Sequence, residues 1–386
     1  MNTGLINRRI APAGIVVALF LLTACGSSGG ATNSSAAHSS ETSASSASNS
    51  SGSASSDAAR SSSSARVEPA EGFQVQGDTL YDNTGVPFVM RGVNYPYAWF
   101  RSSYNTEQQF ADIASTGANT VRVVLANGEQ WNRVSGDEVE NIIGWAKQHQ
   151  LVTMLEVHDA TGWSEKDSAA NPQTAVDYWL SEDVTAAITG EEAYVLINIA
   201  NEPLGNNRTD EWVPFHTGAI EALREGGLTH TLVVDAPNWG QDWKNVMRDG
   251  DGALTIFNAD DQRNVVFSVH MYDVYGDAAE VDDYFQSFSS KSVPLIVGEF
   301  AADHGAGNEV AEEAILAGAE AYGFGYLGWS WSGNTDGGED GTDLSSLDIV
   351  ENFNVDTLSS WGETLIDSEN GIRATSETCQ CFLGNE

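Results

Sequence analysis

Basic residues and cysteine are scarce in this sequence. Only 17 of its 386 residues are Lys or Arg, against 55 Asp and Glu, so the net charge is −38, and the longest basic stretch is the pair Arg8-Arg9. Nucleic acid and anionic surfaces repel such a chain, so we expect no nucleic-acid partner. Three cysteines without clustered histidines argue against a zinc site. No Gly-x-Gly-x-x-Gly follows the first expected strand, and we expect neither a cofactor nor a metal.

Long apolar runs are also missing, and the apolar stretch at residues 10–22 is too short to form a stable membrane span. It follows the pair Arg8-Arg9 and ends in Leu-Thr-Ala-Cys, which is typical of an export signal and resembles a bacterial lipobox. We predict that residues 1–24 are a lipoprotein signal peptide and that Cys25 carries the lipid; an ordinary signal peptide is the alternative. Gly26 after the cysteine favours a lipid-anchored protein of the outer membrane or cell surface over one retained at the inner membrane.

The segment after Cys25 has no apolar face to bury. Residues 26–66 contain 19 serines among 41 residues, and nearly all the others are small or polar. Such a composition is typical of a flexible tether. We therefore expect a lipidated cysteine and a disordered Ser-rich linker at residues 25–66, followed by a single, monomeric catalytic domain at residues 67–386.

Short apolar runs alternate with helical patterns through the rest of the chain, after an expected hairpin at residues 72–86 that turns at 82–85. The runs are rich in Val, Ile and Leu, as in strands buried on both faces. They lie at residues 88–93, 120–125, 152–157, 194–199, 231–234, 265–269, 294–298 and 324–329. Expected helices between them include residues 107–116, 137–148, 174–188, 210–225 and 309–322. Eight strand–helix pairs favour an α/β fold of the (β/α)8 TIM-barrel type.

Polar and aromatic residues lie in, end or follow six of these strands. In a TIM barrel the reactive groups lie at the carboxyl ends of the strands, so these residues are expected to meet at one rim. They are Arg122, His158, Asn201, Glu202, His270, Tyr272, Glu299 and Trp329.

Glu202 and Glu299 end the fourth and seventh strands, which lie nearly opposite each other in a barrel. Two carboxyl groups that flank a glycosidic bond can hydrolyse it, one as acid and the other as nucleophile or base. Tyr272 is expected to donate a hydrogen bond to Glu299 and keep it ionised. Arg122 either lowers the pKa of a nearby carboxyl group or forms a buried pair with the inward-facing Glu156, and both are compatible.

Tryptophans are the second signal. Several lie at or just after strand ends, where an indole can pack against the C–H face of a sugar ring: Trp99, Trp131, Trp163, Trp239, Trp243, Trp329 and Trp331. Trp329 is expected to floor the site of cleavage, and Trp163 and Trp239 are expected to bind substrate. His158 either orients substrate or is a satisfied core histidine. Trp145, Trp179 and Trp212 fall inside helical patterns and are expected in the core.

Six motifs, in this order, resemble those of glycoside hydrolase family 5, and more closely the bacterial endo-β-1,4-mannanases of its subfamily 8. They are RGVN at 91–94, LEVHDATG at 155–162, NIANEP at 198–203, DAPNWGQD at 235–242, SVHMY at 268–272 and WSWSGN at 329–334. The resemblance spans residues 72–382. It implies that Glu202 is the acid/base and Glu299 the nucleophile, and that Arg122, His158, Asn201, His270, Tyr272 and Trp329 occupy other active-site positions.

The implied activity is retaining hydrolysis of internal bonds in β-1,4-mannan, glucomannan or galactomannan, neutral polymers that suit an acidic protein. An endo-β-1,4-glucanase of the same family and a non-catalytic, lipid-anchored glycan-binding protein are the alternatives. A metal-dependent hydrolase using His158, Asp159, His270 and His304 would want a histidine pair at the end of the first strand, where Gly92-Val93-Asn94 stands. Two features stay open: Cys379 and Cys381 form a local disulfide or remain thiols, and the acidic loop at 336–343 is solvated or holds calcium.

Overall fold

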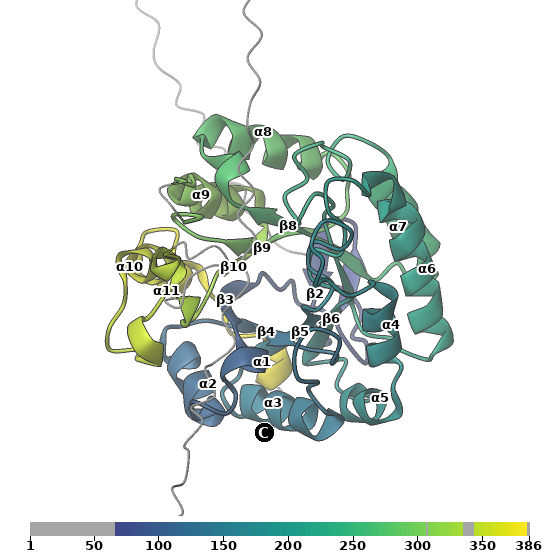
Figure 1. The fold of residues 1–386 in the computed structure, drawn as a ribbon, viewed down its shortest axis with the longest axis horizontal. Coiled ribbons are helices and arrows are strands. Elements are labelled where there is room, and N and C mark those ends of the chain that lie inside the picture. The colour runs from purple at the N-terminus through teal and green to yellow at the C-terminus, as the bar shows by residue number, and fades with distance from the viewer. Residues whose placement is uncertain (1–65, 306–307, 335–342, 384–386) are drawn as a thin grey trace, which may run out of the picture. The chain divides into compact units, whose positions relative to one another are not determined.

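A closed barrel of parallel strands forms the centre of the protein (Figure 1). The computed structural model describes residues 66–305, 308–334 and 343–383. The barrel strands are β3 (Arg91–Tyr95), β4 (Thr120–Leu125), β5 (Val152–Val157), β6 (Val195–Asn198), β7 (Leu232–Asp235), β8 (Val265–Met271), β9 (Leu295–Phe300) and β10 (Gly325–Gly328). Pairing of β10 with both β3 and β9 closes the sheet. The expected TIM barrel is thereby confirmed.

Helices surround this barrel in Figure 1 and bury their apolar faces on the outer surface of the strands. They are α1 (Tyr97–Phe100), α2 (Thr106–Ser115), α3 (Gly136–Gln148), α4 (Gln173–Trp179), α5 (Glu182–Ile188), α6 (Trp212–Glu225), α7 (Gly252–Ala259), α8 (Ala278–Ser289), α9 (Glu312–Tyr322), α10 (Ser360–Asp367) and α11 (Ile372–Thr375). Trp179 and Trp212 are fully buried, and Trp145 packs against the same core, as expected. None of the helices in the described part of the chain is long and apolar enough to cross a membrane.

Two expected elements differ from the structure. The single helix expected at residues 174–188 is two helices, because Ser181 has an extended backbone between α4 and α5, and Asp183 in the first turn of α5 pairs with Arg133 (2.7 Å) beside α3. The hairpin of β1 (Gln74–Gln76) and β2 (Thr79–Tyr81) turns at residues 77–78, where Gly77 has φ 64°. The expected turn at 82–85 is a second turn, which the Asp82 carboxylate stabilises by accepting the Thr84 and Val86 N–H groups.

The barrel interior changes from apolar to polar along the strands. Alternate residues of a barrel strand point inward, so a step of two residues moves one layer toward the carboxyl end. The lower layer is apolar and includes Met154, Leu196, Val233, Val266, Ile296 and Leu327. The inward residues of the upper layers are polar and buried: Asn94, Arg122, Glu156, Asn198, Asp235 and His270. Burying this many polar groups is costly unless they bond to one another, so the upper layer is where a site is expected.

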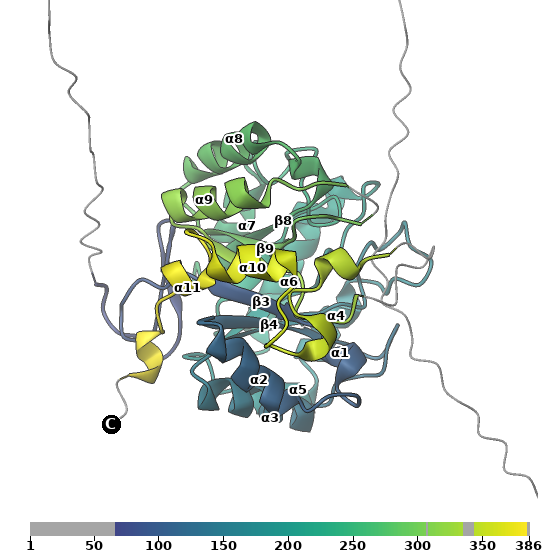
Figure 2. The same cartoon turned by 90° about the vertical axis from the view of Figure 1, so that its left-hand side faces the viewer.

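The hairpin and the C-terminal segment close the opposite end of the barrel. Phe73 and Leu80 pack with the lower apolar layer and with Cys379 and Cys381, which form a disulfide. The Asp82 carboxylate accepts the N–H of Gln380 (3.1 Å). Figure 2 shows the purple hairpin and the yellow C-terminal segment on the same side of the barrel. Both ends of the described domain therefore lie away from the polar end of the barrel.

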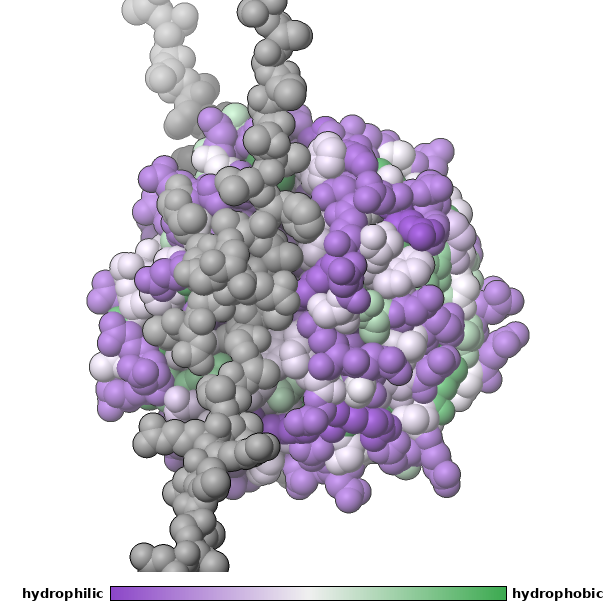
Figure 3. All heavy atoms as spheres, in the orientation of Figure 1, coloured by the Kyte–Doolittle hydropathy of each residue, from purple (hydrophilic) through white to green (hydrophobic). Residues whose placement is uncertain are grey.

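Hydrophilic residues cover most of the coloured surface in Figure 3, which agrees with the charge of −38. Residues 1–65 lie outside the described residues, and with them the expected signal peptide, Cys25 and all of the expected linker except Arg66. The acidic loop is described only at Asp343.

Candidate active site

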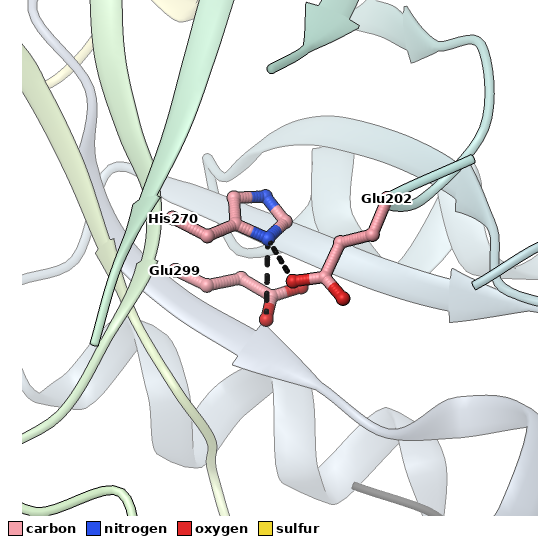
Figure 4. A group of neighbouring side chains, drawn as sticks. All are labelled: Glu202, His270 and Glu299. Atoms are coloured by element: carbon pink, nitrogen blue, oxygen red, sulfur yellow. Dashed lines mark hydrogen bonds and ion pairs between the residues drawn. The ribbon is translucent and has the colours of Figure 1, made fainter. Parts of the chain in front are cut away.

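Glu202, His270 and Glu299 converge at the polar end of the barrel (Figure 4). Glu202 follows β6, His270 is near the end of β8, and Glu299 is near the end of β9. His270 Nδ1 lies 2.7 Å from Glu202 Oε1 and 3.6 Å from Glu299 Oε2. One oxygen of each carboxyl group and this nitrogen all lie within 4.8 Å of one another. The two glutamates expected to act together are thus adjacent, with an imidazole between them.

Two donors hold the Glu299 carboxylate. Arg122 Nη1 donates to Oε1 at 2.7 Å, and the Tyr272 hydroxyl donates to Oε2 at 2.9 Å, the hydrogen bond expected from the sequence. The two donors hold one carboxylate oxygen each and so fix the orientation of the Glu299 side chain. Burial and the Glu299 charge raise the pKa of Tyr272 well above its usual value, so the phenol keeps its proton and remains a donor.

Arg122 is fixed by three asparagines. Its Nη1 also donates to Asn94 Oδ1 (2.8 Å), Nη2 donates to Asn201 Oδ1 (2.7 Å), and Nε and Nη2 donate to Asn198 Oδ1 (3.0 and 2.8 Å). Glu156 lies 3.9 Å from Nη1, much farther than Glu299 at 2.7 Å. The expected Arg122–Glu156 pair exists only as this longer contact, and the arginine mainly orients Glu299 and Asn201.

Glu202 occupies a turn directly after β6. Its φ of 39° is unusual for a residue with a side chain, and its N–H donates to Asp235 Oδ2 at 3.1 Å. Non-glycine residues with such backbone angles persist only where their surroundings hold them, and they cluster at functional sites. Burial raises the pKa of the Glu202 carboxyl group, although the His270 hydrogen bond opposes the rise. Glu202 is therefore the better proton donor of the pair.

Asp235, at the end of β7, connects the acid to the histidine and had no expected role. Its Oδ2 lies 3.4 Å from His270 Nε2 and 3.6 Å from Arg122 Nη2, and its Oδ1 accepts from Asn198 Nδ2 at 3.0 Å. Burial would raise the pKa of Asp235, but His270 and Arg122 lower it overall. The signal for Asp235 in the sequence was an acidic residue that directly ends an apolar run, as Glu299 nearly does.

His270 carries a positive charge at neutral pH. Burial would lower its pKa, but Glu299, Asp235 and Glu202 together raise it to about 10. Gly240 packs against the ring: a Cβ there would lie 2.6 Å from His270 Nδ1. Among the described residues, Glu202, His270 and Glu299 are the one group spaced to hold a metal ion. A metal would need the Nδ1 lone pair that the raised pKa keeps protonated.

Aromatic rings pack beside the carboxyl pair. His158 stacks on Trp329 with centroids 5.7 Å apart and planes at 25°, and Trp99 meets the edge of His158 at 5.0 Å. Trp131 packs edge-on against Trp99 at 5.4 Å. The Nε1 groups of Trp99 and Trp329 have no hydrogen-bond partner within the described ranges. Flat rings with unused donors suit a sugar, whose faces pack on aromatics and whose hydroxyls accept.

The contacts above join six of the predicted residues, and His158, whose Nε2 lies 3.5 Å from Asn201 Nδ2, adds itself and the stacked Trp329. They do not include Trp163 and Trp239. Trp163 is half-buried, with the Arg208 guanidinium 4.9 Å over its ring. Trp239 follows β7, donates from Nε1 to Glu165 Oε2 (2.8 Å), and packs so closely on Gly162 that a Cβ there would lie 1.9 Å from the ring. Both belong to loops at the same end of the barrel as Glu202.

The arrangement has the parts of a retaining glycoside hydrolase. Retaining enzymes hold their two carboxyl groups about 5 Å apart, whereas inverting enzymes leave about 6.5 Å or more for a water molecule. Here one oxygen of Glu202 and one oxygen of Glu299 lie within 4.8 Å of each other, which agrees with the closer spacing of the first class. The raised pKa of Glu202 suits it to donate a proton, while Arg122 and Tyr272 orient Glu299 for attack.

Comparison with known proteins agrees with this geometry. Residues 81–335 match the cellulase family, glycosyl hydrolase family 5. The chain is 50% identical over 322 residues to the mannan endo-1,4-beta-mannosidase of Cellvibrio japonicus, covering 83% of this chain and 72% of that protein. The protein of that name from Streptomyces lividans is 45% identical over 82% of this chain and 79% of its own length. The solved β-mannanase from Thermomonospora fusca superposes with a TM-score of 0.75 at 45% identity, over 81% of this chain and 100% of that one. The chain therefore belongs to glycosyl hydrolase family 5.

Proposed function

We propose that this protein is a retaining endo-β-1,4-mannanase that hydrolyses internal bonds of mannan, glucomannan and galactomannan. The observation that carries the chemistry is the carboxyl pair within 4.8 Å, with Arg122 and Tyr272 on Glu299 and a raised pKa at Glu202. The substrate is supported by relatives at 50% and 45% identity that are named mannan endo-1,4-beta-mannosidases. It is also supported by the Thermomonospora fusca β-mannanase, 44% identical, which has been solved as a mannohexaose complex.

In the first step, a Glu299 oxygen attacks the anomeric carbon while Glu202 gives its proton to the departing glycosidic oxygen. The C–O bond to the leaving sugar breaks, and a glycosyl ester forms on Glu299. Arg122 and Tyr272 hold Glu299 in position for the attack. In the second step, the ionised Glu202 takes a proton from water, the hydroxide attacks the anomeric carbon, and Glu299 leaves as a carboxylate. Two inversions give net retention.

The test follows the anomeric configuration of the first products by NMR on unbranched mannohexaose, with cellohexaose as the control. Early β-anomer from mannohexaose, and much slower cleavage of cellohexaose, is the expected result. Early α-anomer would overturn the retaining mechanism, and cleavage of neither sugar would favour the glycan-binding alternative.

A second candidate substrate is β-1,4-glucan. One relative from Caldicellulosiruptor saccharolyticus, 42% identical over 273 residues, is named beta-mannanase/endoglucanase A, although this chain spans only 20% of that protein. Comparing pure mannan, glucomannan and carboxymethylcellulose separates the two activities. Turnover on carboxymethylcellulose equal to that on mannan would make the enzyme a glucanase as well.

We also propose that the protein is exported and anchored by a lipid on Cys25, at the outer membrane or cell surface. The sequence supports this through the pair Arg8-Arg9, the apolar residues 10–22 and the Leu-Thr-Ala-Cys ending. Fractionation of cells that make the native chain or Cys25→Ser tests it. The native protein should sediment with membranes and the variant should not, whereas equal sedimentation of both would contradict lipidation.

A further inference from the structure

Glu156 and His158 form a buried pair beside the reacting groups. Glu156 lies in β5 and points into the barrel, and His158 follows the strand by one residue. Glu156 Oε1 is 2.9 Å from His158 Nδ1, whereas Arg122 Nη1 is 3.9 Å away. Glu156 Oε2 has no hydrogen-bond partner among the residues that the structure describes. The shortest interaction of this carboxyl group is therefore with the histidine.

On its other side, His158 faces an amide whose orientation is fixed. His158 Nε2 lies 3.5 Å from Asn201 Nδ2. Asn201 Oδ1 accepts from Arg122 Nη2 at 2.7 Å, and an arginine can only donate, so the amide cannot be turned over. Asn201 Nδ2 also donates to Thr161 Oγ1 at 2.9 Å, because the Thr161 hydrogen is donated to the His158 carbonyl at 2.7 Å. The atom that faces His158 Nε2 is thus a donor.

The position of the single imidazole proton follows from these contacts. Burial lowers the pKa of His158 to about 4, so the ring is neutral at pH 7 and carries one proton. A proton on Nε2 would point at the N–H group of Asn201, whereas a lone pair there would accept from it. The proton therefore belongs on Nδ1, where Glu156 Oε1 accepts it.

We infer that Glu156 is a positioning residue that holds the His158 proton on Nδ1 and so presents the Nε2 lone pair to the site as a hydrogen-bond acceptor. The hydrogen bonds then form one chain that runs from Glu299 through Arg122, Asn201 and His158 to Glu156. In the substrate complex this lone pair would be available to a sugar hydroxyl, and only that part of the inference rests on the proposed function. The position of the proton itself does not.

One electrostatic effect opposes this placement of the His158 proton. Burial raises the pKa of Glu156 well above its usual value, and Arg122 works against that rise. If the Glu156 carboxyl group were protonated, it would donate its proton in a hydrogen bond to His158 Nδ1. The ring proton would then be on Nε2, where it would point at the N–H group of Asn201. The two states carry different histidine tautomers, so the tautomer distinguishes them.

Nitrogen NMR of the protein labelled with [15N]histidine measures this tautomer at pH 7 without substrate. The chain supplies both standards. His216 Nδ1 lies 2.8 Å from the Trp212 carbonyl, so its proton is on Nδ1; His230 Nε2 lies 3.0 Å from the Ile188 carbonyl, so its proton is on Nε2. Burial lowers the pKa of both rings to about 4, so both are neutral. His158 should give the shift pattern of His216, and the pattern of His230 would overturn the inference.

Two variants then test the role of Glu156. Glu156→Gln retains an oxygen acceptor and should keep the Nδ1 tautomer, with kcat/KM within about ten-fold of the native value. Glu156→Met removes the acceptor, and it should lower kcat/KM by about ten-fold or more and mix the tautomers. A Met variant with the native tautomer and kcat/KM would contradict the inference. If the Met variant does not fold, a Gln variant with the His230 pattern contradicts it instead. Because the spectrum is recorded on the resting protein, an absence of mannanase activity would not affect this result.

Discussion

At the scale of single residues, the site works because each carboxyl group has its own surroundings. Glu299 accepts from Arg122 and Tyr272. Glu202 is buried against His270, and none of the described arginines donates to it. The two carboxyl groups therefore have different hydrogen-bond partners, although one oxygen of each lies within 4.8 Å of the other. Roles follow from these surroundings, and they can be tested separately.

Replacing Glu299 should abolish hydrolysis but leave the protein folded. For Glu299→Ala we expect kcat on mannan to fall about a thousand-fold or more, because no other group can form the glycosyl ester. Circular dichroism should match the native protein, since the variant leaves Arg122 bonded to three asparagines. An unfolded variant, or one with a tenth of native activity, would argue against a nucleophile.

The loss of rate in Glu202→Ala should depend on the leaving group of the substrate. A dinitrophenyl mannoside needs no proton to depart, so formation of the glycosyl ester should stay near the native rate, whereas mannan hydrolysis should fall about a thousand-fold. A stopped-flow burst of dinitrophenol measures the first step. Equal losses on both substrates would show that Glu202 is not the acid.

The pH dependence of kcat/KM should report the protonation of Glu202. Glu202 must be protonated to act, and burial raises its pKa, so activity should fall as the pH rises through that raised value. His270 opposes the rise, so His270→Asn should move this alkaline limb of kcat/KM to higher pH while lowering the maximum. A limb that stays in place or moves to lower pH contradicts the assignment.

At the level of residues, the sequence predicted convergence at one rim for residues that lie in or shortly after a recognisable strand. The structure brings four of them, Arg122, Glu202, His270 and Glu299, into one cluster. Asp235 was missed, because its partners Glu202, His270 and Arg122 come from other strands and only the closed barrel brings them together. The sequence also could not show whether Glu156 interacts more closely with Arg122 or with His158, because the answer depends on the distances of 3.9 Å and 2.9 Å in the structure.

At the scale of elements, the loops after β5, β6 and β7 support one another. Gly162 has φ 72°, its N–H donates to the Glu202 carbonyl at 3.0 Å, and its missing side chain makes room for Trp239. The turn that carries the acid is thus supported by a glycine from the neighbouring loop. A substitution there should affect catalysis beyond its effect on stability.

Gly162→Ala should displace Trp239 and the Glu202 turn, because the added carbon would lie 1.9 Å from the indole. We expect kcat/KM to fall by about ten- to a hundred-fold, the cost of a misplacement near 1 Å. Gly227→Ala is the matched control: Gly227 has φ 89°, and a Cβ there meets nothing within 4 Å. The control should lose stability without losing kcat/KM, and equal losses in both variants would contradict the coupling.

Strand prediction succeeded for β4 and β5, whose bounds match the expected runs, because both are continuous apolar runs with clear ends. The sixth run was placed too short: β8 extends to Met271, and a register irregularity lies between Val269 and His270. A polar His270 inside a strand looks like a strand end in the sequence. The prediction of one helix at 174–188 was wrong, because the contact of Asp183 with Arg133 joins residues far apart in the sequence.

At the scale of the whole molecule, buried histidines should make stability depend on pH. Burial lowers the pKa of His216 and His230 to about 4, against an ordinary value of 6.5 in the unfolded chain. Unfolding then takes up protons between these values, so the free energy of unfolding should decrease as the pH falls from about 6.5 to about 4, by on the order of 3 kcal/mol per ring. Urea unfolding at several pH values measures this.

The double variant His216→Gln, His230→Gln should flatten that slope, and a native slope would contradict the assignment. His270 contributes with the opposite sign. Its pKa is raised to about 10, so its contribution is present below 6.5 and lost as the pH rises through 10. Stability should therefore be greatest between the two ranges.

The overall architecture was predictable because eight apolar runs of similar length, each followed by a helical pattern, have few ways to bury both faces. The location of the hairpin turn was not, since Gly77 and the 82–85 segment both read as turns and only pairing of β1 with β2 decides between them.

The closed lower end of the barrel has a practical consequence. Phe73, Leu80 and the Cys379–Cys381 disulfide place both ends of the described domain at the pole opposite Glu202 and Glu299. An affinity handle, a resin or a cellulose-binding module joined at either end would leave the catalytic rim open to a polymer arriving from solution. The enzyme should thus be well suited to immobilisation.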